Sequence, residues 1–248
     1  MSHRTAVIGA TLVIAVGMAC GTPATAGGGD TLPLTKRQMR QASMQLSDIP
    51  DSFSEDPHRT TKYAQGVDAT RFDICVNDRA KKVLGKRPAE EMDATIMLKE
   101  AADSRGNFEE RAVISDIYGY TSMKTARRAW KRLDRAADGC AAAVTEDTTV
   151  RGQPGTARIT QRVSHLPRLD GAPGFSISQD IAIEAGSFTI YHDGYMLYRR
   201  VGPMITRIEF INLTSESAAE AELKPRWKRF TRQESATVSG RVAAFLTS

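Results

Sequence analysis

The second half of the chain alternates apolar and polar residues with the two-residue period of β-strands. Runs rich in β-branched and aromatic residues stand at 156–166, 174–184, 187–192, 195–201 and 204–213. Turn-forming pairs separate these runs, and two of the pairs are Asp-Gly, which is among the strongest hairpin signals. The four pairs are Asp170-Gly171, Ala185-Gly186, Asp193-Gly194 and Gly202-Pro203. We therefore expect an antiparallel meander.

Segments with helical spacing of apolar residues stand on both sides of this strand-rich part. The clearest is 122–143, where Trp130, Leu133 and Cys140 fall on one face at three- and four-residue spacing. Shorter helices are expected at 34–46 and 73–85, and a last helix begins near Pro225. A hairpin is expected between the helices at 73–85 and 122–143, with strands at 94–102 and 108–120. The pattern predicts a single α+β domain, a twisted antiparallel sheet packed against amphipathic helices.

Residues 1–26 have the three-part layout of a bacterial export signal: a basic start, an apolar run at 6–16, and small residues. The apolar run is too short and too interrupted to be a membrane-spanning helix. Three glycines then begin a flexible tether at 27–33. We expect an extracytoplasmic protein whose folded domain occupies 34–248.

Two processing sites compete in the leader. Residues 17–21 resemble a permissive lipobox, in which Cys20 would carry diacylglycerol and hold the protein on the outer face of the cell membrane. Cleavage after Ala26, at an ordinary small-x-small site, would instead release a secreted protein. A cysteine at the end of an apolar leader favours the lipoprotein. We expect lipidation at Cys20 and keep secretion as the alternative.

Both processing routes leave two cysteines, Cys75 and Cys140, in an oxidising compartment. We expect them to form a disulfide. It would close a loop of 65 residues (140 minus 75), worth about 4 kcal/mol in the chain-entropy model.

The net charge is mildly basic, with 34 Lys and Arg against 29 Asp and Glu. This excess is far from the dense patch of nucleic-acid-binding proteins, so no nucleic-acid partner is expected. Basic residues nevertheless follow one face of the helix expected at 122–143. They are Lys124, Arg127, Arg128, Lys131, Arg132 and Arg135. The simplest interpretation is a solvated helix face, and the alternative is loose contact with anionic lipid or wall polymer.

Residues suited to catalysis or metal binding are scarce. Beyond the leader the only histidines are His58, His165 and His192, far apart and outside any motif, and both remaining cysteines are expected to pair. We therefore predict no metal, no cofactor, no catalytic residue and no enzyme activity. His192 precedes the expected turn at 193–194, which makes it a solvated residue at a loop tip.

Tyrosines and arginines crowd one expected hairpin, a combination that binding surfaces favour. They are the candidate ligand-binding residues Tyr191, Tyr195, Tyr198, Arg199 and Arg200. The competing interpretation is structural, because alternate aromatic residues of a strand would face the core.

The order of elements resembles the PknH-type extracellular sensor domain family. The resemblance is carried by Leu34-Thr35, by the segment 46–50, and by 125–130 continued through Cys140. It implies an ectodomain of an actinobacterial receptor Ser/Thr kinase or a free-standing lipoprotein, with a twisted antiparallel sheet, packed helices and a cleft. Cys75 and Cys140 correspond in kind to a family disulfide, a second family bridge is missing here, and no family binding residue maps onto this chain.

These features together predict a non-enzymatic envelope protein whose sensor-like domain binds a small envelope molecule or a partner protein. The first alternative is a carrier that holds a lipid or glycolipid in an apolar cavity. The second is a secreted hydrolase, which requires His165 or His192 within hydrogen-bond reach of a serine or a carboxylate.

Overall fold

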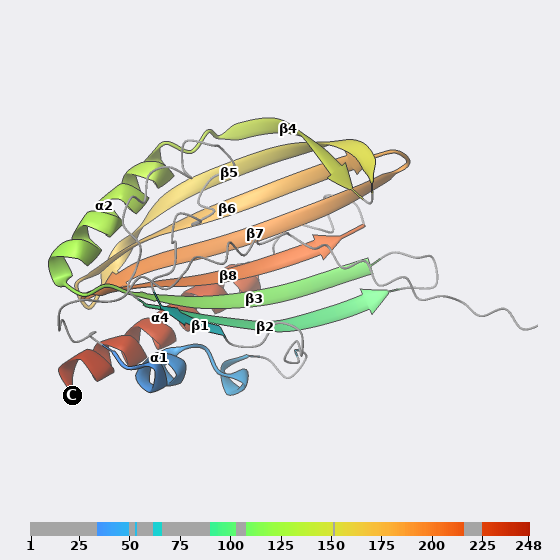
Figure 1. The fold of residues 1–248 in the computed structure, drawn as a ribbon. Helices are drawn as coiled ribbons and strands as arrows, with labels where there is room; N and C mark the ends of the chain where they lie inside the picture. The colour runs from blue at the N-terminus through green and yellow to red at the C-terminus, as the bar shows by residue number, and fades with distance from the viewer. Residues whose placement is uncertain are drawn as a thin grey trace, which may run out of the picture.

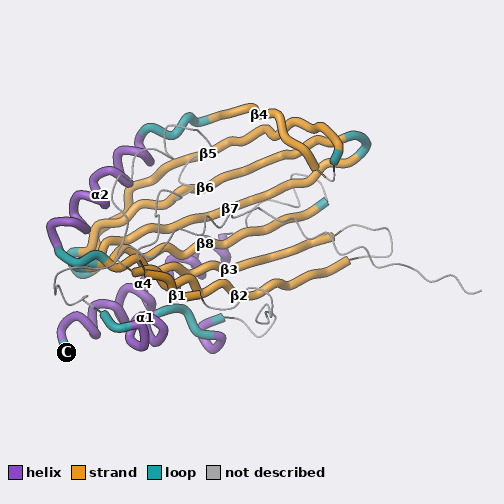
Figure 2. Tube along the Cα trace, in the orientation of Figure 1, coloured by secondary structure: helices purple, strands orange, loops and turns teal. Residues whose placement is uncertain are grey.

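The computed structural model describes residues 34–49, 53, 62–65, 90–102, 108–150, 152–215 and 225–248. Within these residues, eight strands form one sheet with the order β1-β2-β3-β8-β7-β6-β5-β4, and every neighbouring pair is antiparallel (Figures 1 and 2). The strands are β1 (Lys62–Gln65), β2 (Glu90–Ala102), β3 (Phe108–Gly119), β4 (Ala143–Val150), β5 (Gln153–Leu169), β6 (Ala172–Ala185), β7 (Phe188–Val201) and β8 (Met204–Thr214). The predicted α+β class and antiparallel sheet are confirmed.

One predicted turn is wrong. The pair at 193–194 lies inside β7, which is continuous, and Asp193 pairs with Asp180 on β6 and with Asn212 on β8. Pairing on both sides over a long register outweighs the local turn preference of Asp-Gly. The positive backbone φ angles that tight turns need occur instead at Asp170, Gly171, Gly186 and Gly202, at the true hairpin ends.

The central helix is shorter than predicted. α2 (Met123–Asp138) begins at Ser122, whose side chain accepts a hydrogen bond from the Thr125 backbone N–H, and ends at Gly139. The residues after it form β4, which pairs with β5 from Ala143 onward. Sequence reasoning extended the helix into β4 because its alanines fit both elements.

The helices lie on opposite faces of the sheet. On one face are α1 (Lys36–Ala42), the short 3-10 helix η1 (Leu46–Asp48) and α4 (Pro225–Thr247), and on the other is α2 (Figure 1). Neighbouring residues of β7 show the division, because Leu197 packs in the core cluster of α1 and α4 whereas Met196 packs in that of α2. We call the two sides the α4 face and the α2 face.

Several predictions fall on residues that the structure does not describe. They are the export signal, the tether, Cys20, Cys75, His58 and the helix at 73–85. The hairpin expected at 94–102 and 108–120 is confirmed as β2 and β3, and the last helix begins at Pro225 as predicted. None of the helices in the described part of the chain is long and apolar enough to cross a membrane.

Candidate functional site

The most unusual feature of the sheet is a group of polar side chains on its α2 face, in the parts of β3, β7 and β8 nearer the β7–β8 turn. The strand register makes Arg207 the direct cross-strand partner of both Asp116 and Tyr198, so the three residues form one row across the sheet. Tyr118 and Glu209 lie two residues further along their strands on the same face. We call Asp116, Tyr118, Tyr198, Arg207 and Glu209 the polar band.

Ion pairs and a hydrogen bond join the members of the polar band. The Arg207 Nε lies 2.5 Å from the Asp116 Oδ2, and its Nη2 lies 3.6 Å from the Glu209 Oε2. The Tyr118 hydroxyl donates to the Asp116 Oδ2 over 3.1 Å. These groups have little access to water, because the side chains of Arg207 and Asp116 are only 14% and 3% exposed. The polar band is therefore a buried and connected network.

Burial and charge set the protonation states of the band. Burial by itself lowers the pKa of Arg207, but its electrostatic interactions, above all with the carboxylate of Asp116 and also with that of Glu209, outweigh it and raise that pKa well above its usual value. Burial raises the pKa of Tyr198, so its phenol stays neutral. The band thus offers a fixed cation beside a carboxylate and a neutral phenol, that of Tyr198.

Apolar clusters flank the polar band on both sides along the strands. Toward α2 lies the α2-face cluster, which includes Trp130, Leu133, Phe175, Ile177 and Ile205. Toward the other end of the strands lies a second group on the same face, which we call the distal cluster. It consists of Ala112, Ala185, Ile190, Ile211 and Leu213, each no more than 9% exposed. Burying a charge beside such clusters costs several kcal/mol per ion in lost hydration. An apolar core without these charged side chains would avoid this cost.

The five predicted ligand-binding residues do not form one surface. Tyr198 is completely buried in the polar band, on the α2 face. Tyr195 faces α4, where its hydroxyl accepts a 3.2 Å hydrogen bond from the Arg232 Nε, and the half-buried Tyr191 is on the same face.

The two arginines of that set also divide between the faces. Arg199 is 8% exposed on the α4 face, and its Nη1 donates to the Pro167 carbonyl oxygen over 3.4 Å. Arg200 lies on the α2 face, where its Nη1 donates to the Gly202 carbonyl oxygen over 3.3 Å. Strand alternation, the competing interpretation, accounts for this division, and only Tyr198 belongs to the candidate site.

His192 is not the solvated loop-tip residue that the sequence predicted. It lies within β7 on the α2 face, and its Nε2 is buried without a hydrogen-bond partner in the described structure. Burial lowers the pKa of His192 to about 4, although the charge of Asp180 acts in the opposite direction. The ring is therefore neutral at physiological pH.

His165 meets the geometric condition that the hydrolase alternative set. Its Nε2 lies 2.9 Å from the Asp138 Oδ1, and its Nδ1 lies 3.7 Å from the Asp134 Oδ1. The imidazole is 58% exposed, and no serine hydroxyl among the described residues is hydrogen-bonded to it. His165 beside Asp138 could act as a general base, but within the described residues no nucleophile is positioned next to it. Among the described residues, no group of three or more His, Cys, Asp or Glu could hold a metal ion.

Cys140 follows α2 and packs partly against the α2-face cluster. It is disulfide-bonded, and its partner lies outside the described residues. Pairing with Cys75 therefore stays a prediction.

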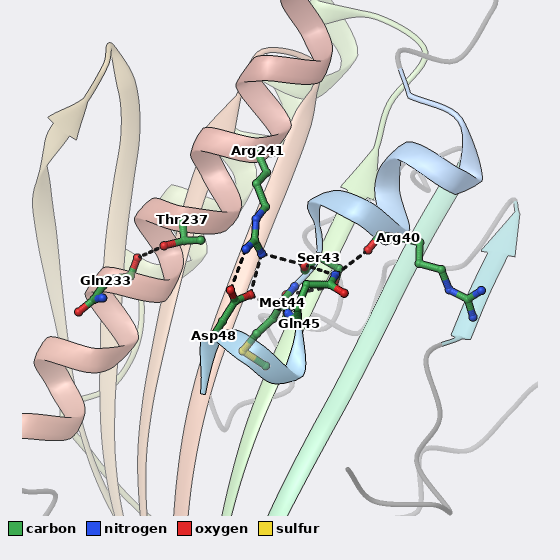
Figure 3. Close-up of polar contacts among 9 residues, drawn as sticks. Arg40, Ser43, Met44, Gln45, Asp48, Gln233, Thr237 and Arg241 are labelled. Carbon is green, nitrogen blue, oxygen red and sulfur yellow. Dashed lines mark hydrogen bonds and ion pairs between the residues drawn. The ribbon is translucent and has the colours of Figure 1, made fainter. Parts of the chain in front are cut away.

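A second, partly buried polar group joins the N-terminal part of the described chain to α4 on the α4 face. Arg241 of α4 binds Asp48 of η1 and also donates to the Ser43 carbonyl oxygen over 3.3 Å (Figure 3). Glu234, seven residues earlier on α4, is 3% exposed, and its Oε2 has no hydrogen-bond partner in the described structure. Burial and the charge of Asp48 raise the pKa of Glu234 to about 7, although Arg241 acts in the opposite direction.

Apart from Tyr198, sequence reasoning missed the polar band, and it also missed Glu234. A signal was present in β8, where Arg207 and Glu209 alternate with isoleucines and phenylalanine, and in β3, where Asp116 interrupts an apolar run. Such a pattern is usually a solvated strand face, so the burial of these charges is evident only from the folded structure.

Comparison with known proteins leaves the resemblance to sensor domains untested. No protein-family model matches the chain, and no curated protein matches it.

Proposed function

We propose that this protein is an exported, lipid-anchored and non-enzymatic envelope protein whose sensor-like domain binds a small envelope molecule at the polar band. The observation that carries the proposal is the Asp116, Arg207 and Glu209 network, buried on the α2 face between two apolar clusters. Sites for small molecules are commonly apolar with a few convergent polar groups.

The composition of the site indicates the chemistry of the ligand. Arg207 can bind an acidic or carbonyl group, and the carboxylates of Asp116 and Glu209 can accept hydrogen bonds from a hydroxyl or amine. The flanking clusters favour a molecule that also has an apolar body. The proposed ligand is therefore amphipathic, with a polar group that both donates and accepts hydrogen bonds.

The second candidate is a carrier for a lipid or glycolipid. The distal cluster supports it, since this apolar group continues the α2 face beyond the polar band. The two candidates differ in where the ligand makes most of its contacts.

Native mass spectrometry of the protein purified from its own host tests the proposal. We expect a co-purified small molecule in wild-type protein, and lower occupancy in Glu209→Gln and Tyr198→Phe, which change single polar groups and keep the side-chain shape. Glu184→Gln is the matched control, because Glu184 is 49% exposed at the far end of β6 and should leave occupancy unchanged.

The outcomes separate the candidates. Occupancy that falls in Ile211→Ala but not in Glu209→Gln would favour the carrier. Empty wild-type protein, or equal occupancy in wild type, Glu209→Gln and Ile211→Ala, would contradict both.

A further inference from the structure

The outward face of α2 is a concentrated basic surface. Six of the helix's basic side chains are exposed, whereas Trp130, Leu133 and the alanines of its other face are buried against the sheet. The six are Lys124, Arg127, Arg128, Lys131, Arg132 and Arg135. The first turn of α2 contains no acidic residue. Its two acidic residues, Asp134 and Asp138, are at the other end, beside His165.

Two arginines of the sheet extend this surface. Arg168 of β5 is exposed, and Arg200 of β7 is half-buried on the α2 face. The pKa of Arg200 is lowered first by burial and then by the positive charges of Arg127 and Arg168. Arg200 therefore lies close enough to both Arg127 and Arg168 to be repelled by them, and an anionic partner would relieve that repulsion.

An exposed apolar side chain stands at the start of the same helix. Met123 is 42% exposed. Its sulfur lies close to Gly202, since a Cβ added to that glycine would be 3.9 Å from it. Gly202 directly follows β7, at the end of the strand that bears Arg200. Figure 1 shows α2 along one end of the sheet, at the outside of the described fold. Exposed basic residues together with an apolar side chain are typical of a helix that lies at a lipid headgroup layer.

We propose that the outward face of α2, with Arg168, Arg200 and Met123, docks on the anionic phosphate headgroups of a phospholipid bilayer. The inference rests on the lipid anchor of the proposed function. With the lipid on Cys20, thirteen residues (21–33) separate the anchor from the domain and reach at most about 50 Å, which keeps the domain near the membrane and makes weak contacts effective. Docking would turn a tethered domain into an oriented one.

Vesicle co-sedimentation tests the proposal, with the mature chain from residue 20 carrying Cys20→Ser so that no lipid is attached. We expect binding to vesicles of phosphatidylcholine with phosphatidylglycerol, weakening with added salt, and little binding to phosphatidylcholine alone. Each basic residue near such a surface contributes about fivefold in affinity, so Arg127→Gln, Arg128→Gln and Arg132→Gln together should weaken binding by about a hundredfold.

The matched control removes three exposed arginines from the α4 face. Arg37→Gln, Arg40→Gln and Arg229→Gln change the net charge equally and lie on α1 and α4. Equal losses in the two triple variants would overturn the proposal, because binding would then follow net charge alone.

Two further outcomes would overturn it. One is wild-type protein that binds both kinds of vesicle equally. The other is wild-type protein that binds isolated anionic wall polymer but not vesicles. Failure of the anchor is a separate result, read from the intact mass at Cys20, and it leaves the vesicle assay interpretable.

Discussion

Arg241 of α4 binds both carboxylate oxygens of Asp48 in η1, with hydrogen bonds of 2.7 Å from Nη1 to Oδ2 and 2.7 Å from Nη2 to Oδ1 (Figure 3). This bidentate pair joins residues 193 positions apart in the chain. Burial alone would raise the pKa of Asp48, but its hydrogen bonds from Arg241 and from the Gln45 backbone N–H lower that pKa.

Asp48→Asn should destabilise the fold by about 1–3 kcal/mol at pH 7, because it removes one charge of a partly buried bidentate pair. The pKa of Asp48 is lower in the folded state, so its contribution is present above the unfolded value of 3.8 and is lost as the pH falls through the folded value. Urea unfolding at pH 7 and pH 3 measures both effects. A deficit as large at pH 3 as at pH 7 would contradict the role of the charge.

Glu234→Gln should stabilise the protein at pH 8 and have little effect at pH 4. The pKa of Glu234 is raised from 4.5 to about 7, so the folded state binds its proton more tightly than the unfolded state does. Wild-type stability should therefore fall as the pH rises from about 4.5 to 7, by up to about 3 kcal/mol. Urea unfolding of both proteins across this range checks the sign, with the exposed Glu184→Gln as the control.

The two tryptophans allow a test of whether the described fold unfolds as one unit. Trp130 packs against Phe175 on the α2 face, with ring centroids 5.4 Å apart, and Trp227 stacks on Phe210 on the α4 face at 4.6 Å. The variants Trp130→Phe and Trp227→Phe each retain one tryptophan as a fluorescent reporter. In each variant we expect the unfolding midpoint measured by fluorescence to agree with the midpoint measured by circular dichroism. Fluorescence and circular dichroism transitions that separate within one variant would argue for two units and against a single domain.

Loss of the disulfide should destabilise the protein by about 2–4 kcal/mol. We expect Cys140→Ser and Cys75→Ser to lower the midpoint of urea unfolding equally, and Cys20→Ser to leave it unchanged. Peptide mapping without reduction should recover a fragment that joins Cys75 to Cys140. A fragment that joins Cys140 to Cys20 would show the pairing to be wrong and would exclude lipidation of that molecule.

The sequence predicted those parts of the fold that depend on local pattern. Strand alternation gave the meander and the β2–β3 hairpin, and helical spacing gave α2 and α4, because both periods are visible in short windows. The turn at 193–194 failed because pairing with β6 and β8, which the window does not contain, decides the backbone of β7.

The candidate site was harder to predict, because its residues come together only through pairing between strands that are far apart in the sequence. Asp116 and Arg207 become neighbours only because β3 pairs with β8, and the order of strands in a sheet is not visible in either segment alone. The same limit explains Asp48 and Arg241. Tyr198 was selected for its chemistry, and strand alternation then separated it from Tyr195 and Arg199.

β4, one of two strands that the sequence did not predict, also bears on self-association. Among the described strands β4 is the last of the sheet, and no described strand pairs with its outer edge, the kind of edge that can pair with another chain. At its middle stand the exposed residues Glu146 and Asp147. A second copy that added antiparallel to this edge about its midpoint would place these carboxylates opposite each other, and like charges in direct cross-strand contact repel. The two carboxylates therefore discourage fibre-like extension of the described sheet at its β4 edge.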